Sequence, residues 1–309
     1  MTTSRRQFLQ CFTAGATGAA WIAGGESRLR ANPLRLPIGL QLWTVREELE
    51  KNYDATLRKI AAIGYREIEF FELPTPVAAY RKKFEDAGLS CVSGHFELDS
   101  FKSQQTIDAV KELGLRYMIV VFPTLRNPKD ANLVHMKFDD LVPLYEKISL
   151  DDYKWNAEQL NKYGAVLRKN GLQLGYHNHA VDFKRFGDTV ALDLLIQSTD
   201  PSLVVFELDC GHVVHAGYDP IAYLKKYPTR IQLLHLKDLK PGFVVTTSLA
   251  AENMGTNAEI GDGVIQWEQL FKAAKQAAVK HYFVEHEGKM NHPPLEAITY
   301  SYKFLHSLE

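Results

Sequence analysis

The stretch GLQLGYHNHAVDF, residues 171–183, is apolar and aromatic until it reaches His177, Asn178 and His179. His177 and His179 stand two residues apart, so in an extended strand both side chains point to the same side. Imidazoles bind divalent metals and transfer protons near neutral pH. The pair therefore predicts a metal ligand, a proton carrier, or one of each. The alternative is that at most one of the two is functional.

Polar side chains also end most of the other short apolar runs. Each one alone is more often a satisfied polar residue or a helix cap than a functional group. Together their imidazoles and carboxylates form a mixed nitrogen and oxygen set, which suits Mn²⁺, Zn²⁺, Co²⁺ or Fe²⁺ better than Ca²⁺ or Mg²⁺. The residues at these ends are Gln41, Trp43, Glu69, Glu72, His95, Asp209, His212, His235, Lys237, Asp238, Glu285 and Glu287.

Eight short apolar runs alternate with amphipathic stretches, which predicts eight strands, each followed by a helix and none by a hairpin. Such an order requires right-handed crossovers and a parallel sheet. A single-domain α/β fold, the (β/α)₈ TIM barrel, fits over residues 32–309, and it brings all strand ends to one mouth. An open doubly wound sheet fits less well, because QLWTVRE replaces the glycine-rich loop after the first strand. The predicted strands are 38–42, 66–70, 90–95, 116–122, 172–177, 203–209, 231–236 and 282–286.

The helix-like stretches include residues 46–64, 104–114, 153–171 and 267–278. Several of these amphipathic segments close with a glycine, which is the usual residue for a left-handed helix cap. These glycines are Gly64, Gly88, Gly114 and Gly171.

Residues 1–31 have the pattern of a cleavable twin-arginine signal peptide. Arg5 and Arg6 precede Gln7 and a modestly apolar run rich in Ala, Gly and Thr. A membrane anchor is the alternative, but Gln10 and several threonines and glycines interrupt the run, so stable membrane insertion is not expected. The pattern predicts a periplasmic or extracellular protein that is folded before export.

Composition narrows the choice of partners. Residues 1–31 hold four Arg and one Glu, so the remaining 278 residues carry 32 basic and 36 acidic side chains and a net charge of about −4. No basic stripe suggests nucleic acid. Cys91 and Cys210 lie in apolar runs, which predicts two buried thiols instead of a disulfide. A homo-oligomer is left open.

At this point the motifs IGLQLWTVREEL, LDCGHVVHAGYDP, LHLKDL, EIGDGVIQWEQLF and YFVEHE carry a resemblance. They resemble the sugar isomerase/epimerase superfamily with the xylose-isomerase-like TIM barrel, on its inosose-dehydratase side. The resemblance covers nearly all of the chain after residue 31. Each motif alone is weak, and their order along the strands is specific.

The resemblance implies one divalent metal ion, with Mn²⁺ favoured and Zn²⁺, Co²⁺ or Fe²⁺ as alternatives. It implies Asp209, His235 and Glu285 as ligands, and it places His177 where the epimerases have a glutamate ligand. His179 or Glu287 would then move the proton. The remaining positions are expected to contact the substrate: Gln41, Trp43, His95, His212 and Lys237.

We therefore expect a metal-dependent sugar isomerase/epimerase, which removes a proton next to a carbonyl and passes through an enediolate. Its substrate would be a small sugar or keto-sugar. A keto-sugar dehydratase or lyase shares the same first step and is an alternative, as is a non-catalytic periplasmic sugar-binding protein. A hydrolase with His-x-His on its first strand does not match QLW, and a DNA-processing endonuclease would need a basic groove.

Overall fold

The computed structural model describes residues 32–126, 138–249 and 255–308. The predicted signal peptide, residues 1–31, lies outside these ranges. The predicted domain from residue 32 onward falls largely within them.

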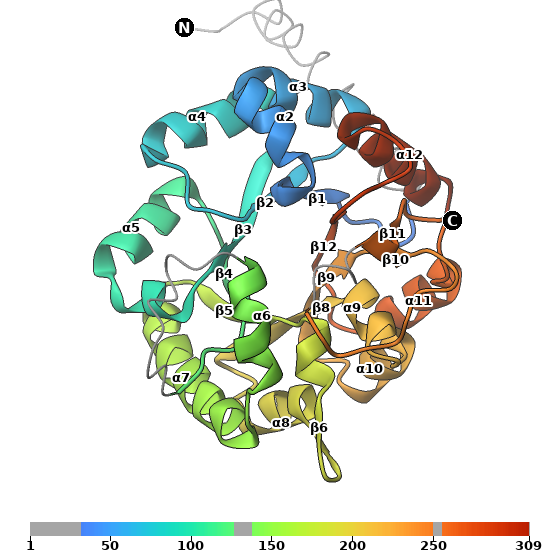
Figure 1. Ribbon diagram of the computed structural model, residues 1–309. Helices are drawn as coiled ribbons and strands as arrows, with labels where there is room; N and C mark the ends of the chain where they lie inside the picture. The colour runs from blue at the N-terminus through green and yellow to red at the C-terminus, as the bar shows by residue number, and fades with distance from the viewer. Residues whose placement is uncertain (1–31, 127–137, 250–254, 309) are drawn as a thin grey trace, which may run out of the picture.

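Within the described ranges, eight parallel strands close into a barrel, as Figure 1 shows in a view into its centre. All eight lie where the sequence predicts a strand, which confirms the (β/α)₈ prediction. Going round the barrel, β5, β8, β9 and β12 are consecutive neighbours, and β12 closes the barrel against β1. The strands are β1 Gly39–Gln41, β2 Glu67–Phe70, β3 Ser90–Phe96, β4 Tyr117–Val120, β5 Gln173–His177, β8 Val204–Asp209, β9 Ile231–Leu236 and β12 His281–Val284.

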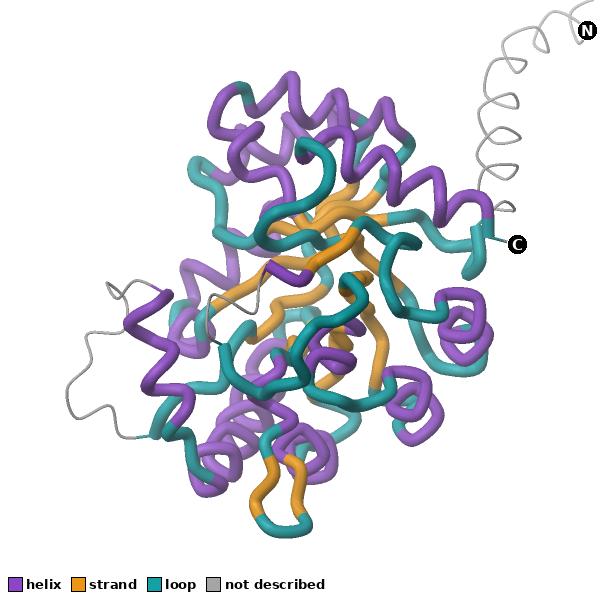
Figure 2. Tube along the Cα trace, turned by 45° about the vertical axis from the view of Figure 1, so that its right-hand side comes forward, coloured by secondary structure: helices purple, strands orange, loops and turns teal. Residues whose placement is uncertain are grey.

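Helices surround the strands on the outside of the barrel (Figures 1 and 2). Their apolar faces pack against the outward-facing strand residues and form the main core. The α-helices are α2 Arg46–Lys51, α3 Tyr53–Ile63, α4 Val77–Ala87, α5 Gln104–Leu113, α6 Phe138–Glu146, α7 Leu150–Lys169, α8 Ala191–Ser198, α9 Cys210–His215, α10 Pro220–Lys226, α11 Trp267–Ala274 and α12 Pro294–Ser307. Short 3₁₀ turns are η1 Leu42–Val45, η2 Leu98–Lys102 and η4 Ala180–Phe183.

The predicted helix over 46–64 is in fact two helices. Asn52 is extended, with φ −162° and ψ 96°, and its side chain accepts a hydrogen bond from the backbone N–H of Ala55. Asparagine is a favoured N-cap, so it ends α2 and starts α3. The glycines predicted as caps do have positive φ: 133° at Gly64 and 71° at Gly88.

The expectation of no hairpins is wrong at one place beside the barrel. β6 Arg185–Phe186 pairs antiparallel with β7 Thr189–Val190, and the hairpin turns at Gly187-Asp188, where Gly187 has φ 64°. Such a glycine–aspartate pair is a known hairpin signal, but the strands flanking it are only two residues long. A second antiparallel pair, β10 Asp238–Leu239 with β11 Asn257–Ala258, joins two segments that are separated by the 17 residues 240–256.

The EIGDG motif has a structural explanation in Asp238, at the start of β10. The Asp238 carboxylate accepts hydrogen bonds from the N–H groups of Gly261 at 3.1 Å and Gly263 at 3.3 Å, and from Nε1 of Trp267 at 2.7 Å. A Cβ atom at Gly263 would lie 2.1 Å from Asp238 Oδ1, so this glycine allows the close approach. Asp238 therefore holds the loop before α11 against β10.

The interior of the barrel holds a small second apolar cluster, which includes Val205, Leu233 and Phe283. Because side chains alternate along a strand, these residues face inward while their neighbours join the outer core. Cys91 and Cys210 are buried free thiols, as predicted. Above this apolar cluster, toward the carboxyl ends of the strands, the inward-facing residues become polar and charged.

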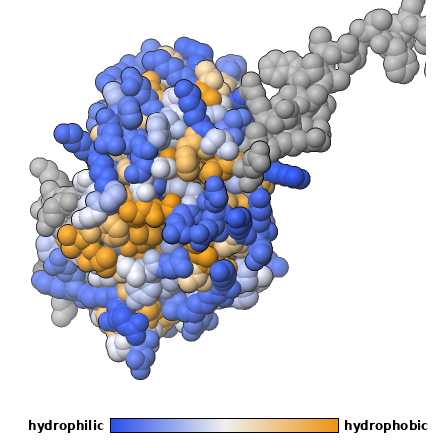
Figure 3. All heavy atoms as spheres, turned by 90° about the vertical axis from the view of Figure 1, so that its right-hand side faces the viewer, coloured by the Kyte–Doolittle hydropathy of each residue, from blue (hydrophilic) through white to orange (hydrophobic). Residues whose placement is uncertain are grey.

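The surface in Figure 3 is mostly hydrophilic, with an interrupted hydrophobic area. Val244, Val245 and Val264 are among the exposed large apolar residues of the described chain. Among the described residues, no helix combines the length and the apolar character needed to cross a membrane.

Candidate functional site

Four consecutive strands supply the first group of side chains at the carboxyl end of the barrel. His177 ends β5, Asp209 ends β8, His235 lies one residue before the end of β9, and Glu285 follows β12 directly. Asp209 is level with His235 in the β8–β9 pairing, and His235 is level with Phe283 in the β9–β12 pairing. The barrel thus brings together the four residues that the sequence predicts as metal ligands.

We call His177, Asp209, His235 and Glu285 the outer cluster. One nitrogen or oxygen atom from each of these side chains lies within 4.8 Å of those of the other three. All four residues are buried, and none is more than 4% exposed. Two imidazoles and two carboxylates are a donor set that fits a divalent transition metal, so the chemistry of these residues is compatible with the predicted ion.

Lys237 places a positive charge beside the outer cluster. Its Nζ atom lies 3.0 Å from Asp209 Oδ2, 3.0 Å from Glu285 Oε2 and 2.9 Å from Glu287 Oε2. Burial alone would lower the pKa of Lys237, but these carboxylates, Asp209 foremost, raise it well above its usual range. These contacts favour the charged ammonium form of Lys237, which is not a nucleophile.

Gly211 at the start of α9 makes room for the lysine stem. A Cβ atom at Gly211 would lie 2.7 Å from Lys237 Cγ and 2.8 Å from Lys237 Cβ. The side chain of Lys237 is only 2% exposed, so its course is fixed by this contact and by the carboxylates around its end.

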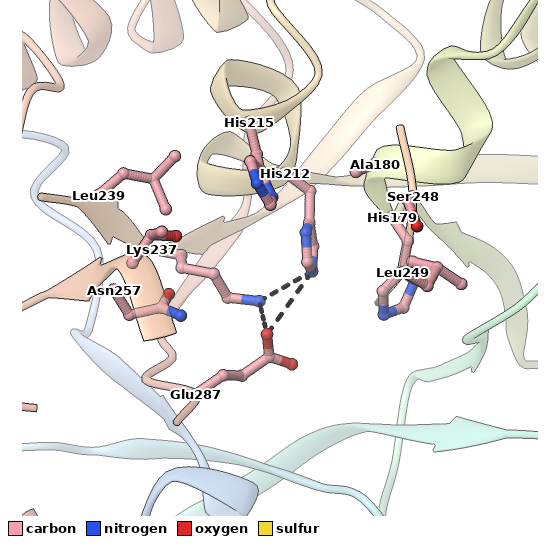
Figure 4. Close-up of a pocket in the computed structure, with 11 residues that line it drawn as sticks. His179, Ala180, His212, His215, Lys237, Leu239, Ser248, Leu249, Asn257 and Glu287 are labelled. Atoms are coloured by element: carbon pink, nitrogen blue, oxygen red, sulfur yellow. Dashed lines mark hydrogen bonds and ion pairs between the residues drawn. The ribbon is translucent and has the colours of Figure 1, made fainter. Parts of the chain in front are cut away.

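A small cavity adjoins the outer cluster, with His212 between His179 on one side and Lys237 and Glu287 on the other (Figure 4). The cavity measures about 20 Å³, which is room for about one water molecule. His179 stacks on Phe122, with ring centroids 3.9 Å apart, and its ring lies 4.7 Å from that of His212. His212 Nε2 is 3.0 Å from Lys237 Nζ, so His212 accepts a hydrogen bond from the ammonium.

The surroundings of His177 and of the cavity-lining His179 and His212 favour the neutral form of each imidazole. Burial lowers the pKa of His177, His179 and His212 well below the usual value, and the charge of Lys237 adds to the effect at each one. The rings of His177 and His179 are 4.9 Å apart, as expected for two residues on the same side of a chain. Neutral imidazoles have a free nitrogen lone pair, which can accept a proton or bind a metal.

A second layer lies beneath the outer cluster and contains two carboxylates, Glu69 on β2 and Glu207 on β8. Glu69 Oε1 is 2.7 Å from His235 Nε2, 3.0 Å from His95 Nε2 and 2.8 Å from Gln41 Nε2. Burial would raise the pKa of Glu69, but the neighbouring histidines lower it far below its usual range. Glu69 is therefore a buried carboxylate anion.

Glu207 completes this layer. Its Oε2 atom is 3.1 Å from His177 Nδ1, 3.2 Å from His95 Nε2 and 3.3 Å from His235 Nε2. Burial and then the charge of Glu69 raise the pKa of Glu207 to about 7. Burial would lower the pKa of His95, but Glu69 and Glu207 together outweigh burial and raise the pKa to about 9.

The sequence alone did not identify this layer. Glu69 was one of many polar strand ends without an assigned role, and Glu207 lies inside the apolar run LVVFELD. The sequence does contain one signal for Glu207, which is its spacing from Asp209. The two carboxylates are two residues apart, so both must face the same side of the strand. Carboxylates are rarely buried in the middle of a strand unless they are paired or belong to a functional site.

The remaining predicted substrate contacts lie at different depths. His95 and Gln41 are in the second layer, and Gln41 Oε1 also accepts a hydrogen bond from the N–H of Trp43 at 3.1 Å. Trp43 itself is on the surface, 37% exposed, with its ring edge-on to Phe71 and the Arg46 guanidinium 4.1 Å from its ring centroid. Of the predicted substrate contacts, His212 and Lys237 line the cavity.

Fold and site together define a (β/α)₈ barrel with a cluster of histidines and carboxylates at the carboxyl ends of its strands. Residues 57–308 match the family described as Xylose isomerase-like TIM barrel, and the chain belongs to this family.

Named relatives agree with this membership. An inosose dehydratase of Clostridium beijerinckii is 35% identical over 244 residues, 72% of this chain and 78% of that protein. An inosose dehydratase of Clostridium perfringens is 34% identical over 139 residues, which is 42% of this chain and only 46% of the relative's length. A sugar phosphate isomerase/epimerase of Parabacteroides distasonis has a similar solved structure, with a TM-score of 0.69 and 26% identity over 88% of this chain and 94% of that one.

Proposed function

We propose that this chain is a metal-dependent enzyme that acts on a keto-sugar or an inosose. It removes the proton from the carbon next to the carbonyl and then completes a dehydratase or lyase reaction. The observation that carries the proposal is the outer cluster, a complete metal-binding donor set with the neutral imidazole of His179 beside it. The inosose dehydratases at 34–35% identity support elimination as the outcome.

His177, Asp209, His235 and Glu285 would hold the ion, and the mixed donor set favours Mn²⁺. A divalent ion bound there supplies a Lewis acid that polarises the substrate carbonyl. The cavity has room for about one water molecule, so the side chains that line it, Leu249 among them, must move to admit a sugar.

The residues of the chain itself move the protons. Neutral His179 accepts the proton from carbon, and the electrons of the broken C–H bond form a C=C double bond as a β-hydroxyl departs. That hydroxyl needs a proton in order to leave as water. His179, protonated in the first step, can pass that proton to the departing hydroxyl, and Glu287, a carboxylate 2.9 Å from Lys237 Nζ, lies across the cavity from His179 as a second proton acceptor. Lys237 donates hydrogen bonds to His212 and to Glu287.

A sugar isomerase or epimerase is the second candidate. The observation that favours it is the same pair of proton-transfer groups, because His179 and Glu287 lie on different sides of the cavity (Figure 4). Such a pair can remove a proton from one face of a carbon and return one to the other face or to a neighbouring carbon. The solved isomerase/epimerase at 26% identity supports this outcome.

Two single variants test the proposal. We expect His177→Ala to lose bound metal, since it removes a ligand, and His179→Ala to keep the metal and lose turnover by about 10²–10⁴-fold, the usual contribution of a general base. Metal content is measured after purification without chelators. Turnover is followed by NMR in D₂O with inososes, ketoses and 3-keto-glycosides, which also separates elimination from deuterium return to carbon.

His306→Ala is the matched control, because this imidazole lies on the outer helix α12 and contacts Tyr302. It should keep both metal and turnover. A wild-type protein that binds no divalent metal, or a His179→Ala variant that exchanges deuterium as fast as the wild type, would refute the assigned roles.

A further inference from the structure

The second layer of the site places carboxylates against both imidazoles of the outer cluster. Glu69 is the nearer carboxylate to His235 Nε2, at 2.7 Å against 3.3 Å for Glu207, and Glu207 lies 3.1 Å from His177 Nδ1. We propose that Glu69 and Glu207 are positioning residues that fix the metal-facing nitrogens of His235 and His177. This inference rests on the proposed metal site. It concerns residues that neither line the cavity nor belong to the outer cluster.

Glu69 acts on His235. With Nε2 of His235 held at 2.7 Å from Glu69 Oε1, the other ring nitrogen, Nδ1, points to the outer cluster and lies 2.9 Å from Glu285 Oε2. Gln41 Nε2 donates a hydrogen bond to the same Glu69 oxygen at 2.8 Å. The hydrogen bond from Nε2–H to the carboxylate thus fixes both the ring orientation and the nitrogen left for a metal.

Glu207 acts on His177 in the same way. Its Oε2 atom lies 3.1 Å from His177 Nδ1, which leaves Nε2 as the nitrogen available to the outer cluster. The two imidazoles therefore use opposite ring nitrogens, Nδ1 in His235 and Nε2 in His177. Each choice follows from the position of the carboxylate beneath the ring.

Folding alone does not account for this layer. Replacing buried ionic groups by apolar residues of similar volume is often neutral or stabilising, so a barrel interior does not require them. In addition, Glu69 Oε2 and Glu207 Oε1 are buried and have no hydrogen-bond partner among the described residues. Burying two carboxylate oxygens without hydrogen bonds destabilises the folded state. A role in orienting the metal ligands would explain why these carboxylates are present.

The same strand offers a matched control. Glu67 precedes Glu69 by two residues on β2, faces the same way, and pairs with His281 Nδ1 at 2.8 Å. It is also buried, at 7% exposure, but it lies at the amino end of the strand, away from the outer cluster. Glu67→Gln therefore removes a buried glutamate–histidine pair without touching the proposed metal ligands.

The test compares Glu69→Gln, Glu207→Gln and Glu67→Gln with the wild type. Mn²⁺ affinity is measured by titration calorimetry and by the electron paramagnetic resonance signal of free Mn²⁺, and folding by circular dichroism. Losing such a partner typically costs about 10–100-fold in metal affinity, so we expect this loss in the first two variants and less than about threefold in Glu67→Gln. The Co²⁺-loaded absorption spectrum should change only in the first two, because it reports ligand geometry.

A further variant covers the case in which a glutamine variant does not fold. Gln41→Met keeps both carboxylates and removes one donor to Glu69, and it should weaken Mn²⁺ binding by a few-fold, less than the loss of a whole carboxylate.

Equal Mn²⁺ affinity in Glu69→Gln, Glu207→Gln and wild type overturns the inference, as does an equal loss in Glu67→Gln. Two bound ions per wild-type chain, falling to one in either second-layer variant, would make this layer a metal site of its own and also overturn it. A wild-type chain that binds no metal refutes the proposed function first, which separates that failure from failure of the positioning role.

Discussion

Removing the ammonium of Lys237 should have opposite effects on the metal-free protein and on metal binding. In Lys237→Met the stem is replaced by a side chain of similar length, but the carboxylates of Asp209, Glu285 and Glu287 lose the cation that lies within 3.0 Å of each. The metal-free variant then holds several buried negative charges close together. A divalent ion is the natural replacement for the missing charge.

The size of both effects can be estimated. Breaking a buried ion pair by removing one partner costs about 3–5 kcal/mol. For a domain of this size each kcal/mol shifts the melting temperature by about 2–4 °C, so metal-free Lys237→Met should melt roughly 6–20 °C below the wild type. Two unit charges 4 Å apart interact by about 4 kcal/mol at an effective dielectric constant of 20. Relief of even a third of that repulsion would tighten Mn²⁺ binding about tenfold.

The assay is differential scanning calorimetry of metal-free protein, followed by titration with Mn²⁺. Adding Mn²⁺ should raise the melting temperature of Lys237→Met more than that of the wild type, because a tighter ligand stabilises more at equal concentration. Lys226→Met is the matched control. Its partner Asp193 is 2.8 Å away but Lys226 is half exposed, so that pair should contribute less than about 1 kcal/mol.

Two results would refute this reasoning. If metal-free Lys237→Met melts with the wild type, the ammonium does not compensate the carboxylates. If the variant binds Mn²⁺ more weakly than the wild type, Lys237 organises the ligands for the metal and does not compete with it.

Two further predictions concern other parts of the chain. Burial raises the pKa of Asp182 to about 7. The protonated carboxyl therefore stabilises the fold at low pH, and up to about 4 kcal/mol of this stability is lost as the pH rises from about 4 through 7. The melting temperature of Asp182→Asn should rise relative to that of the wild type between pH 5 and pH 8, and a difference that does not vary with pH would contradict this. We also propose export by the twin-arginine route to the periplasm or beyond, so Arg5→Lys combined with Arg6→Lys should leave the protein folded in the cytoplasm on fractionation, and normal export of the double variant would count against the signal.

The barrel was predictable because its signals are local. Apolar runs, amphipathic stretches and glycine caps each lie within a few residues of sequence, and all eight strands appear where these signals put them. The break at Asn52 was missed because a capping side chain resembles any other polar residue within a helical pattern. The short hairpin at Gly187 was missed because its strands are too brief to show alternation.

The grouping of the outer cluster was also predictable, because a closed parallel barrel brings every strand end to one mouth. The contacts that these side chains make with one another were not predictable. Lys237 was expected to contact substrate, and nothing in LHLKDL shows that its ammonium meets carboxylates from β8 and from the segment after β12. Glu207 was hidden by the apolar residues around it. These contacts depend on strand register and side-chain reach, which a sequence does not state.

One geometric rule explains why chemically similar residues have different surroundings in this site. A step of two residues along a strand keeps a side chain on the inner face but moves it about 6–7 Å toward the mouth. Glu67 therefore pairs with His281 at the amino end, whereas Glu69 contacts His235 beneath the outer cluster. The same step leads from Glu207 in the second layer to Asp209 in the outer cluster. Depth along the barrel axis, which is set by the position of a residue along its strand, separates the side chains that would hold the metal from those that would orient them. The variants at Glu67 and Glu69 test this separation directly.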